Sequence, residues 1–376
     1  MVEKENSSRL GHPSGNRVDS QVPPLRMVAW EVTRSCNLNC IHCRAAAGRG
    51  PYPGELNTEE SFRLIDGIVS FSKPVIIFTG GEPLLRKDIY DLASYGTSRG
   101  LRMVISPNGT LLDAPKAARL KASGIQRVSI SLDGATEESH DRFRQVEGAF
   151  AGALRGIQFL KEVGLEFQIN TTVTQKNHRE LSRILNLAVK LGAAAHHIFL
   201  LVPTGRGKEL KGEAVDGSEY EKLLLWLYEQ RGKVPLQLKA TCAPHYYRIL
   251  RQRAAEEGKK ITPQTHGLDA TTRGCLGGVG FLFVSHRGDV QPCGYLEAFC
   301  GNVRQQSLEE IWASSPVFLK LRDFPSLKGR CGRCEYVRVC GGCRARAFER
   351  SMDFMEEEPL CVYQPKRDAI YMHSQS

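Results

Sequence analysis

The chain has 376 residues, of which 41% are hydrophobic, and its formal net charge is +10. This length and composition suit one large domain or two smaller ones with a sizeable core, and they exclude a membrane-spanning helix, because no run approaches eighteen apolar residues. The excess of positive charge suggests an acidic partner. Nucleic acid is disfavoured, since no block of Lys and Arg is interleaved with aromatic residues. A small polyanionic substrate fits the charge, as does a surface that is merely solvated.

The first 26 residues are polar, with Gly, Ser and Pro and no apolar segment, so they do not form a secretory signal. Their low hydrophobicity cannot offset the entropy lost on ordering, and we expect a flexible tail. The chain has twelve cysteines without an export signal. This combination indicates metal ligation in a reducing cytoplasm rather than disulfide bonds.

Between residues 27 and 230, apolar segments typical of strands alternate with amphipathic segments typical of helices. The expected strands cover 27–32, 74–79, 101–106, 126–132, 166–174 and 196–202. The expected helices cover about 58–71, 87–99, 113–123, 148–163, 178–191 and 218–230. Six β-α units predict an α/β fold with a parallel sheet and helices outside, either an open doubly wound sheet or a barrel that lacks two of its eight units.

Polar or glycine-containing loops follow all six expected strands. Ligands of parallel α/β folds bind at the carboxyl ends of the strands, so these loops should share one rim. In chain order they contain Cys36, Cys40 and Cys43, then Gly80, Gly81, Glu82 and Pro83, then 107–110, then Ser131, Asp133 and Gly134, then Thr171 and Thr172, and finally 203–207.

The last third of the chain differs in composition. Residues 231–270 are charged and are expected to form a connector with helical pieces. From Cys275 to Cys361 the chain is rich in glycine and cysteine and has little periodicity, so we expect it to fold around metal. The predicted organisation is a tail (1–26), a barrel (27–230), a connector (231–270) and a metal-binding domain (271–376).

Cys36, Cys40 and Cys43 form a C-x3-C-x2-C triplet just after the first expected strand. Soft thiolates select iron–sulfur clusters or zinc. A four-iron cluster normally takes four thiolates, so three of them leave one iron open to a small molecule. On the residues alone, a partial zinc site or three chance core cysteines remain alternatives.

The triplet and the Gly80-Gly81-Glu82-Pro83 segment together resemble the radical S-adenosylmethionine (SAM) enzymes, over about residues 27–215. The resemblance implies a partial (β/α)6 TIM-type barrel in which the amino and carboxylate groups of SAM chelate the open iron. It implies that residues 80–83 receive the amino group, for which the Glu82 carboxylate and bare glycine carbonyls are suited. Ser131 and Asp133 match positions that contact the ribose. Arg206 is a candidate clamp for the SAM carboxylate or for substrate.

Seven C-terminal cysteines resemble the SPASM extension of these enzymes, although two residues rather than three separate Cys340 from Cys343. By this resemblance, one auxiliary four-iron cluster is held by Cys331, Cys334, Cys340 and Cys361, and a second receives Cys275, Cys293 and Cys343. Zinc is the alternative, because C-x2-C pairs also bind zinc. The eighth ligand is Cys242, which we favour, or Cys300, Asp269, water or substrate.

Three stretches, at 28–36, 242–248 and 291–296, resemble the haem synthases of the siroheme-dependent haem pathway. That resemblance implies that iron-coproporphyrin III is the substrate and that two of its propionates become vinyl groups. Candidate ligands of the carboxylates are Arg44, Arg206 and Arg248, because Arg binds carboxylates in a bidentate manner. Candidates to stack on or ligate the iron porphyrin are His245, Tyr246 and Tyr247.

The implied reaction begins with reductive cleavage of SAM to a 5′-deoxyadenosyl radical, which takes a hydrogen from the propionate β-carbon. Loss of carbon dioxide and one electron then gives the vinyl group, with an auxiliary cluster as the fitting acceptor. An electron donor such as ferredoxin or flavodoxin is implied as a partner. Alternatives are removal of acetate side chains from 12,18-didecarboxysiroheme, modification of a peptide, and a non-catalytic iron–sulfur electron carrier or binding module.

Overall fold

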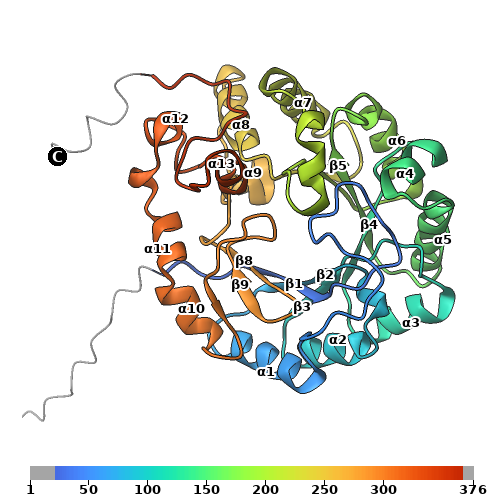
Figure 1. Ribbon diagram of the computed structural model, residues 1–376. Coiled ribbons are helices and arrows are strands. Elements are labelled where there is room, and N and C mark those ends of the chain that lie inside the picture. Colours follow the sequence, from blue (N-terminus) through green and yellow to red (C-terminus); the bar gives the residue numbers. More distant parts are fainter. Residues whose placement is uncertain (1–21, 367–376) are drawn as a thin grey trace, which may run out of the picture.

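In the computed structural model, which describes residues 22–366, one curved ten-stranded sheet has the order β10-β9-β8-β1-β2-β3-β4-β5-β6-β7 (Figure 1). Neighbours among β1 to β7 are parallel and follow one another in chain order. These strands are β1 Met27–Thr33, β2 Val75–Gly80, β3 Arg102–Ile105, β4 Arg127–Ser131, β5 Phe167–Val173, β6 Ala195–Leu200 and β7 Gln237–Thr241.

This strand order decides between the two predicted architectures. A doubly wound sheet reverses its strand order at a switch point. Consecutive order with right-handed crossovers instead keeps every connecting helix on one side, so the sheet curls into a partial barrel. The helices lie around the outside of the curve (Figure 1). The partial-barrel prediction is therefore confirmed, and the doubly wound alternative is wrong.

Half of the eight barrel helices begin at a residue whose side chain caps the helix. At α1, the Asn57 side chain accepts a hydrogen bond from Glu60 N–H at 2.9 Å, and the Glu60 carboxylate accepts one in return from Asn57 N–H. The barrel helices are α1 Thr58–Val69, α2 Ile89–Ser98, α3 Ala114–Ala122, α4 Glu137–Arg144, α5 Ala149–Glu162, α6 Leu181–Leu191, α7 Gly217–Gln230 and α8 His245–Glu256. Short 3-10 turns lie at Pro83–Leu85, His178–Glu180 and Gly205–Glu213.

The strands and helices that were expected between residues 27 and 230 are all present in the structure. The structure has one further α-helix there, α4, that was not expected. Helix α4 was not predicted, because its sequence is strongly polar and only His140, Phe143 and Arg144 are buried. The expectation that 231–270 contains helical pieces is confirmed by α8, but the same segment also supplies β7, which was missed. Strand β7 pairs with β6 from Ala195 to Phe199, so the barrel has a seventh parallel strand.

The cysteine-rich segment extends the same sheet at its other edge. Strand β8 (Phe281–Val284) pairs in parallel with β1, starting at Met27 opposite Phe281. The short strands β9 (Asp289–Gln291) and β10 (Gly301–Asn302) continue from it with antiparallel pairing. The remaining elements are α9 Pro263–His266, α10 Leu308–Ser314, α11 Pro316–Arg322, α12 Gly329–Gly332 and α13 Arg344–Ser351, with 3-10 turns at Gly267–Ala270 and Phe324–Ser326.

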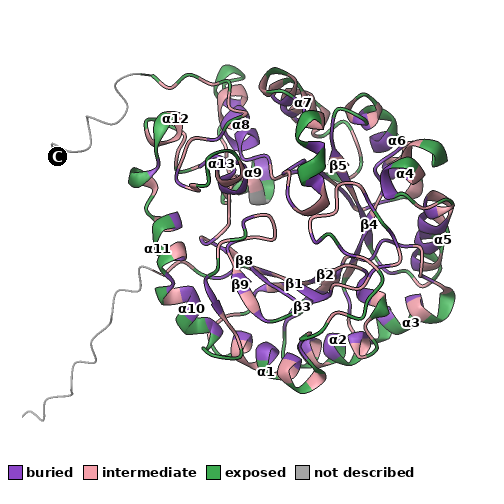
Figure 2. Ribbon diagram, in the orientation of Figure 1, coloured by how far each residue is buried: buried purple, intermediate pink, exposed green. Residues whose placement is uncertain are grey.

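The two faces of the barrel sheet differ in burial. On the outer face, alternate side chains such as Val28, Trp30 and Phe78 are fully buried in a core shared with the helices. Figure 2 shows buried residues along the strands and exposed ones on the outer sides of the helices. On the inner face, alternate residues such as Asn170 and His197 are only partly buried. This inner surface is where solvent, and hence a ligand, has access.

Most of the predicted tail, residues 1–21, lies outside the described residues. Residues 22–26 were expected to belong to it, but they are packed. Leu25 is buried, and Trp312 Nε1 donates to the Pro23 carbonyl oxygen at 2.9 Å. The apolar Leu25 side chain accounts for this difference. Among residues 22–366, no helix combines the length and the apolar character needed to cross a membrane.

Candidate active site

The triplet of Cys36, Cys40 and Cys43 lies in the loop after β1, folded back by a hydrogen bond from Cys36 N–H to the Gly48 carbonyl (2.8 Å). The Leu38 and Ala47 N–H groups both donate to sulfur at 3.4 Å, to Cys36 Sγ and Cys43 Sγ respectively. Such donors suit thiolates that bind iron. Burial raises the pKa of Cys36 to about 11, so iron must displace its proton on binding.

Gly80 and Gly81 let the end of β2 touch the chain just before the triplet. A side chain on Gly80 would place Cβ 2.1 Å from the Thr33 carbonyl oxygen, and one on Gly81 would place it 2.3 Å from that of Ser35. The contact is held by hydrogen bonds from Gly81 N–H to Thr33 O (2.8 Å) and from Glu82 N–H to Ser35 O (2.7 Å). The glycines therefore position the cysteine loop.

Replacing Gly81 by alanine should push the cysteine loop away from β2. Overpacking of this kind costs about 1–3 kcal/mol, and here the obstacle is backbone that cannot rotate away. We expect a lower melting temperature and loss of roughly four irons per chain after anaerobic reconstitution. The matched control is Gly67→Ala, since Gly67 lies in α1 with no atom within 4 Å of the added Cβ. Full iron content and unchanged stability in Gly81→Ala would contradict this role.

Glu82 is fully buried, and both of its carboxylate oxygens are occupied. Oε1 accepts a hydrogen bond from Leu84 N–H at 2.9 Å, and Oε2 accepts one from Asn108 N–H at 2.6 Å. Burial raises its pKa to about 7 despite these two bonds. The expectation that this carboxylate receives an ammonium is thus not supported. Its contacts instead join the loops after β2 and β3, and the glycine carbonyls remain the candidates.

Asp133 was expected to contact a ribose, but its carboxylate is buried and paired. It forms an ion pair with the Arg144 guanidinium and accepts a hydrogen bond from Thr172 N–H at 2.7 Å. Arg144 Nη1 also donates to Cys40 Sγ at 3.5 Å. Asp133 therefore positions Arg144, which the sequence analysis missed because it lies in the unpredicted helix α4. Ser131 ends β4, is partly exposed, and stays a predicted ribose contact.

Arg206 holds the cysteine loop. Its Nε donates to the Cys40 carbonyl at 2.9 Å, and its Nη1 donates to the Ala47 carbonyl at 2.7 Å. The preceding Gly205 has a φ of +55°, and a Cβ there would lie 2.1 Å from the Arg44 carbonyl oxygen. The guanidinium is thus largely engaged by backbone, which does not favour its predicted role as a carboxylate clamp.

Arg44 was expected to bind a substrate carboxylate, but it pairs with a carboxylate of the protein. Its Nη2 lies 2.8 Å from Glu31 Oε2, and His286 Nδ1 lies 2.8 Å from Glu31 Oε1. Although burial opposes ionisation, the charge of Arg44 and the hydrogen bond of His286 lower the pKa of Glu31 to about 2. Arg44 is therefore neutralised within the barrel, and Glu31 is a second site residue that sequence reasoning missed.

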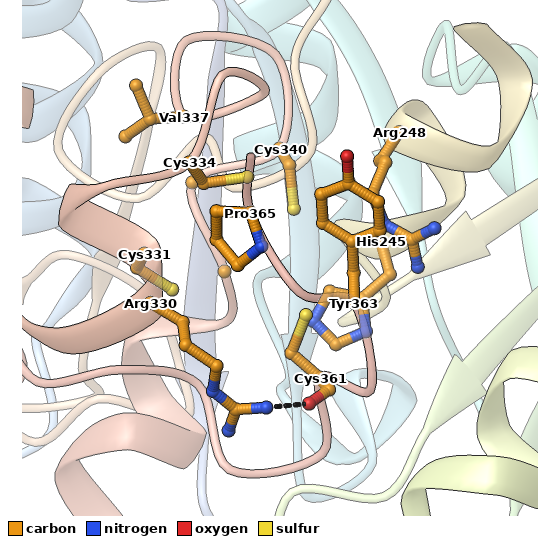
Figure 3. A pocket seen from close by; sticks show the side chains of 12 residues that line it. His245, Arg248, Arg330, Cys331, Cys334, Val337, Cys340, Cys361, Tyr363 and Pro365 are labelled. Atoms are coloured by element: carbon orange, nitrogen blue, oxygen red, sulfur yellow. Dashed lines mark hydrogen bonds between the residues drawn. The ribbon is translucent and has the colours of Figure 1, made fainter. Parts of the chain in front are cut away.

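Four cysteines that were predicted to hold one auxiliary cluster line a single cavity (Figure 3). They are Cys331, Cys334, Cys340 and Cys361. Backbone N–H groups of Glu358 and Tyr336 donate at 3.4 Å to Cys331 Sγ and Cys334 Sγ. Donors to sulfur and a cavity between the thiols both fit a polynuclear cluster.

The other auxiliary set gathers around Cys242. Burial raises the pKa of Cys242 well above its ordinary value, and the nearby thiols of Cys343, Cys293 and Cys275 raise it further. Cys242 has a φ of +54°, unusual for a non-glycine residue, and its carbonyl accepts a hydrogen bond from Arg346 Nη2 at 2.6 Å. The structure therefore brings Cys242 to the three predicted cysteines.

The other candidates for the eighth ligand lie elsewhere. Cys300 is buried in the main barrel core, where its thiol donates to the Ala298 carbonyl at 3.5 Å. Asp269 forms an ion pair with Arg231. Within residues 22–366, no three His, Cys, Asp or Glu side chains are close enough to share one metal ion.

The first turn of α8 was expected to contact the porphyrin, but its side chains are buried at between 1% and 3% exposure. His245 Nε2 lies 2.6 Å from Glu358 Oε2, Tyr246 Oη accepts a bond from Arg231, and Tyr247 Oη donates to Asp269 at 3.2 Å. Arg248 pairs with Glu221 at 2.5 Å. These internal partners do not favour the stacking, which stays a prediction. His245 and Arg248 instead line the four-cysteine cavity (Figure 3).

Comparison with known proteins follows the same division of the chain. Residues 30–188 match the Radical SAM superfamily, and residues 275–344 match the SPASM iron-sulfur cluster-binding domain. The chain is 54% identical to an AdoMet-dependent heme synthase of Nitratidesulfovibrio vulgaris, over 95% of this chain and 98% of that relative. It is 34% identical to an Fe-coproporphyrin III synthase of Methanosarcina barkeri, over 92% and 89%.

The fold is similar to a solved structure, that of Streptococcus suis SuiB bound to S-adenosylmethionine. The TM-score is 0.71 at 16% identity, with 91% of this chain and 78% of that chain covered. At this low identity the likeness concerns the fold alone.

Proposed function

Because the chain belongs to the family of the AdoMet-dependent heme synthases, radical SAM enzymes with a SPASM domain, we propose that it converts iron-coproporphyrin III to haem b. In this reaction two propionate side chains become vinyl groups by oxidative decarboxylation. The observation that carries the proposal is 54% identity along 98% of a heme synthase, against 34% to the Fe-coproporphyrin III synthase.

The cofactors are SAM and four-iron clusters. We assign the SAM-binding cluster to Cys36, Cys40 and Cys43, whose loop is held by Gly81 and by Arg206. When bound, SAM and the clusters supply the one-electron chemistry for removing a hydrogen atom and for taking up the electron left after decarboxylation. The Arg144 guanidinium donates to Cys40 Sγ and so places a positive charge beside the cluster site.

We assign the auxiliary clusters to two four-thiol sets. One is the cavity set of Cys331, Cys334, Cys340 and Cys361. The other is Cys275, Cys293 and Cys343 with Cys242 as the fourth ligand, supported by the closeness of these thiols. Arg346 supports this geometry by binding the Cys242 carbonyl and, at 2.7 Å, the Glu358 carboxylate.

The proposal implies a tetrapyrrole substrate and a small electron donor such as ferredoxin or flavodoxin. It also places the enzyme in a reducing cytoplasm. All twelve cysteines are free thiols in the structure, as metal ligation requires.

The proposal is tested by incubating the reconstituted enzyme anaerobically with SAM, a strong reductant and iron-coproporphyrin III. We expect the porphyrin to lose the mass of two formic acid molecules. Each propionate side chain that becomes a vinyl group loses one carbon dioxide and two hydrogen atoms, which together have the mass of formic acid. Mass spectrometry of the extracted porphyrin measures this. An unchanged porphyrin alongside conversion of 12,18-didecarboxysiroheme would overturn the assignment in favour of acetate removal.

A further inference from the structure

A continuous polar row crosses four strands on the inner face of the barrel. Backbone pairing aligns Ser131 of β4 with Asn170 of β5, Asn170 with His197 of β6, and His197 with Lys239 of β7. Paired residues of neighbouring parallel strands face the same side of the sheet, so these four side chains all face the barrel interior. The row therefore begins at the predicted ribose contact, Ser131, and ends at a lysine.

The orientation of Lys239 follows from its neighbours along β7. Leu238 and Ala240 pack into the apolar core formed with α7 and α8. Since successive side chains of a strand point to opposite faces, Lys239 lies on the inner face. It is partly buried there, as are Asn170 and His197 in the same row. The side chains of this row are thus partly accessible from the barrel interior, and they are not part of the apolar core.

The Lys239 ammonium has no ion pair or hydrogen bond with any residue of the described range 22–366. The inner positions of β4 to β7 carry no carboxylate, as the sequences of these strands show. Asp269 is the one acidic neighbour that raises the pKa of Lys239, and its carboxylate is already engaged by Arg231 and Tyr247. Burial lowers the pKa of Lys239, because an unpaired buried charge is costly. A bound anion would remove that cost.

His197 provides a second donor beside Lys239. Gln168 Nε2, which can only donate, lies 3.0 Å from His197 Nδ1. Burial, with a smaller effect from the charges of Lys239 and Arg127, lowers the pKa of His197 to about 3. The imidazole is therefore neutral near pH 7, and its single proton lies on Nε2. This N–H is available to an acceptor in the same row.

We propose that Lys239, assisted by His197 Nε2–H, binds a carboxylate of the tetrapyrrole substrate inside the barrel. The inference rests on the proposed function, because that function supplies an anionic ligand with several propionates. Three strand spacings separate Lys239 from Ser131, or roughly 14 Å, so a macrocycle bound at Lys239 reaches toward the SAM side of the row. Lys239 is thus assigned as a substrate-binding residue that the sequence analysis did not select.

The test is an anaerobic absorbance titration of the reconstituted holoenzyme with iron-coproporphyrin III. We expect Lys239→Met to weaken binding by at least about tenfold, since it removes a charged hydrogen-bond donor. Lys239→Arg, which keeps the charge, should bind within about threefold of the wild type. The matched control is Lys190→Met, because Lys190 is an exposed lysine on α6. Iron content and SAM affinity should not change in any of these variants.

The outcomes separate the inference from the function on which it rests. If the wild-type enzyme does not bind iron-coproporphyrin III, the proposed function fails. If the wild type binds and Lys239→Met binds equally well, the assignment of Lys239 is overturned. A loss of SAM affinity in Lys239→Met would overturn it too, since the bound carboxylate would then be that of SAM. Lys239→Gln, of similar polarity, replaces Lys239→Met should the latter not fold by circular dichroism.

Discussion

Alanine at Cys40 is expected to abolish the release of 5′-deoxyadenosine from SAM under a strong reductant. The triplet supplies three thiolates to a cluster that normally takes four, so loss of one more leaves too few ligands to retain the cluster. Cys40 is also the thiol to which Arg144 donates, and its loss leaves a buried guanidinium with one partner fewer. We expect no product above the level without enzyme and about four fewer irons per chain.

The matched control for Cys40 is Cys300→Ala. Both thiols are 8% exposed, but Cys300 lies in the barrel core and near none of the cysteine sets. Cys300→Ala should retain its iron and its activity, with only a modest loss of stability. Continued release of 5′-deoxyadenosine by Cys40→Ala, measured by liquid chromatography, would refute the assignment of the cluster to this loop.

Alanine at Cys340 is expected to separate SAM cleavage from haem formation. Cys340 is buried in the wall of the four-cysteine cavity, whereas the triplet loop follows β1 in the barrel. We expect iron to fall from about twelve to about eight per chain, with no haem formed. Release of 5′-deoxyadenosine should persist, because the triplet is intact. Iron assays and chromatography of both products measure this difference.

Cys242→Ser provides the parallel test of the other auxiliary set. If Cys242 is the fourth ligand, its iron loss should match that of Cys340→Ala, whereas Cys300→Ala should lose none. Haem formation by Cys340→Ala at the wild-type rate would show that the cavity cluster is dispensable. Stoichiometric zinc in place of iron would remove the auxiliary clusters from the proposal altogether.

The parallel barrel was predictable because its signal is local. Each of β1 to β6 lies in a segment typical of strands that is followed by an amphipathic segment, and that alternation allows few architectures. Strand β7 escaped detection because its sequence, Gln-Leu-Lys-Ala-Thr, has only two apolar residues and lies in a segment rich in charged residues. Helix α4 escaped because its charged residues outnumber its few buried ones. Both omissions therefore concern elements that line or approach the site.

The cysteine sets were predictable for a similar reason, since ligand spacing is encoded within short segments. The partners of charged side chains were not. Arg206 reaches the Cys40 carbonyl across 166 positions of sequence, and Arg144 reaches Cys40 Sγ across 104. Glu31, buried in β1, forms an ion pair with Arg44, which was predicted to bind a substrate carboxylate. Such pairings depend on which strands become neighbours, and composition carries no trace of that.

The pairing of β8 with β1 has a consequence for biosynthesis. During synthesis, strand β1 acquires one of its two neighbours, β2, early, but the other, β8, is translated only after the strands β2 to β7. Until then β1 keeps a free hydrogen-bonding edge, and unpaired strand edges of this kind invite association with other chains. The loop that carries Cys36 directly follows that strand. In a nascent chain, the iron ligands of this loop therefore lie next to a strand edge that is not yet paired.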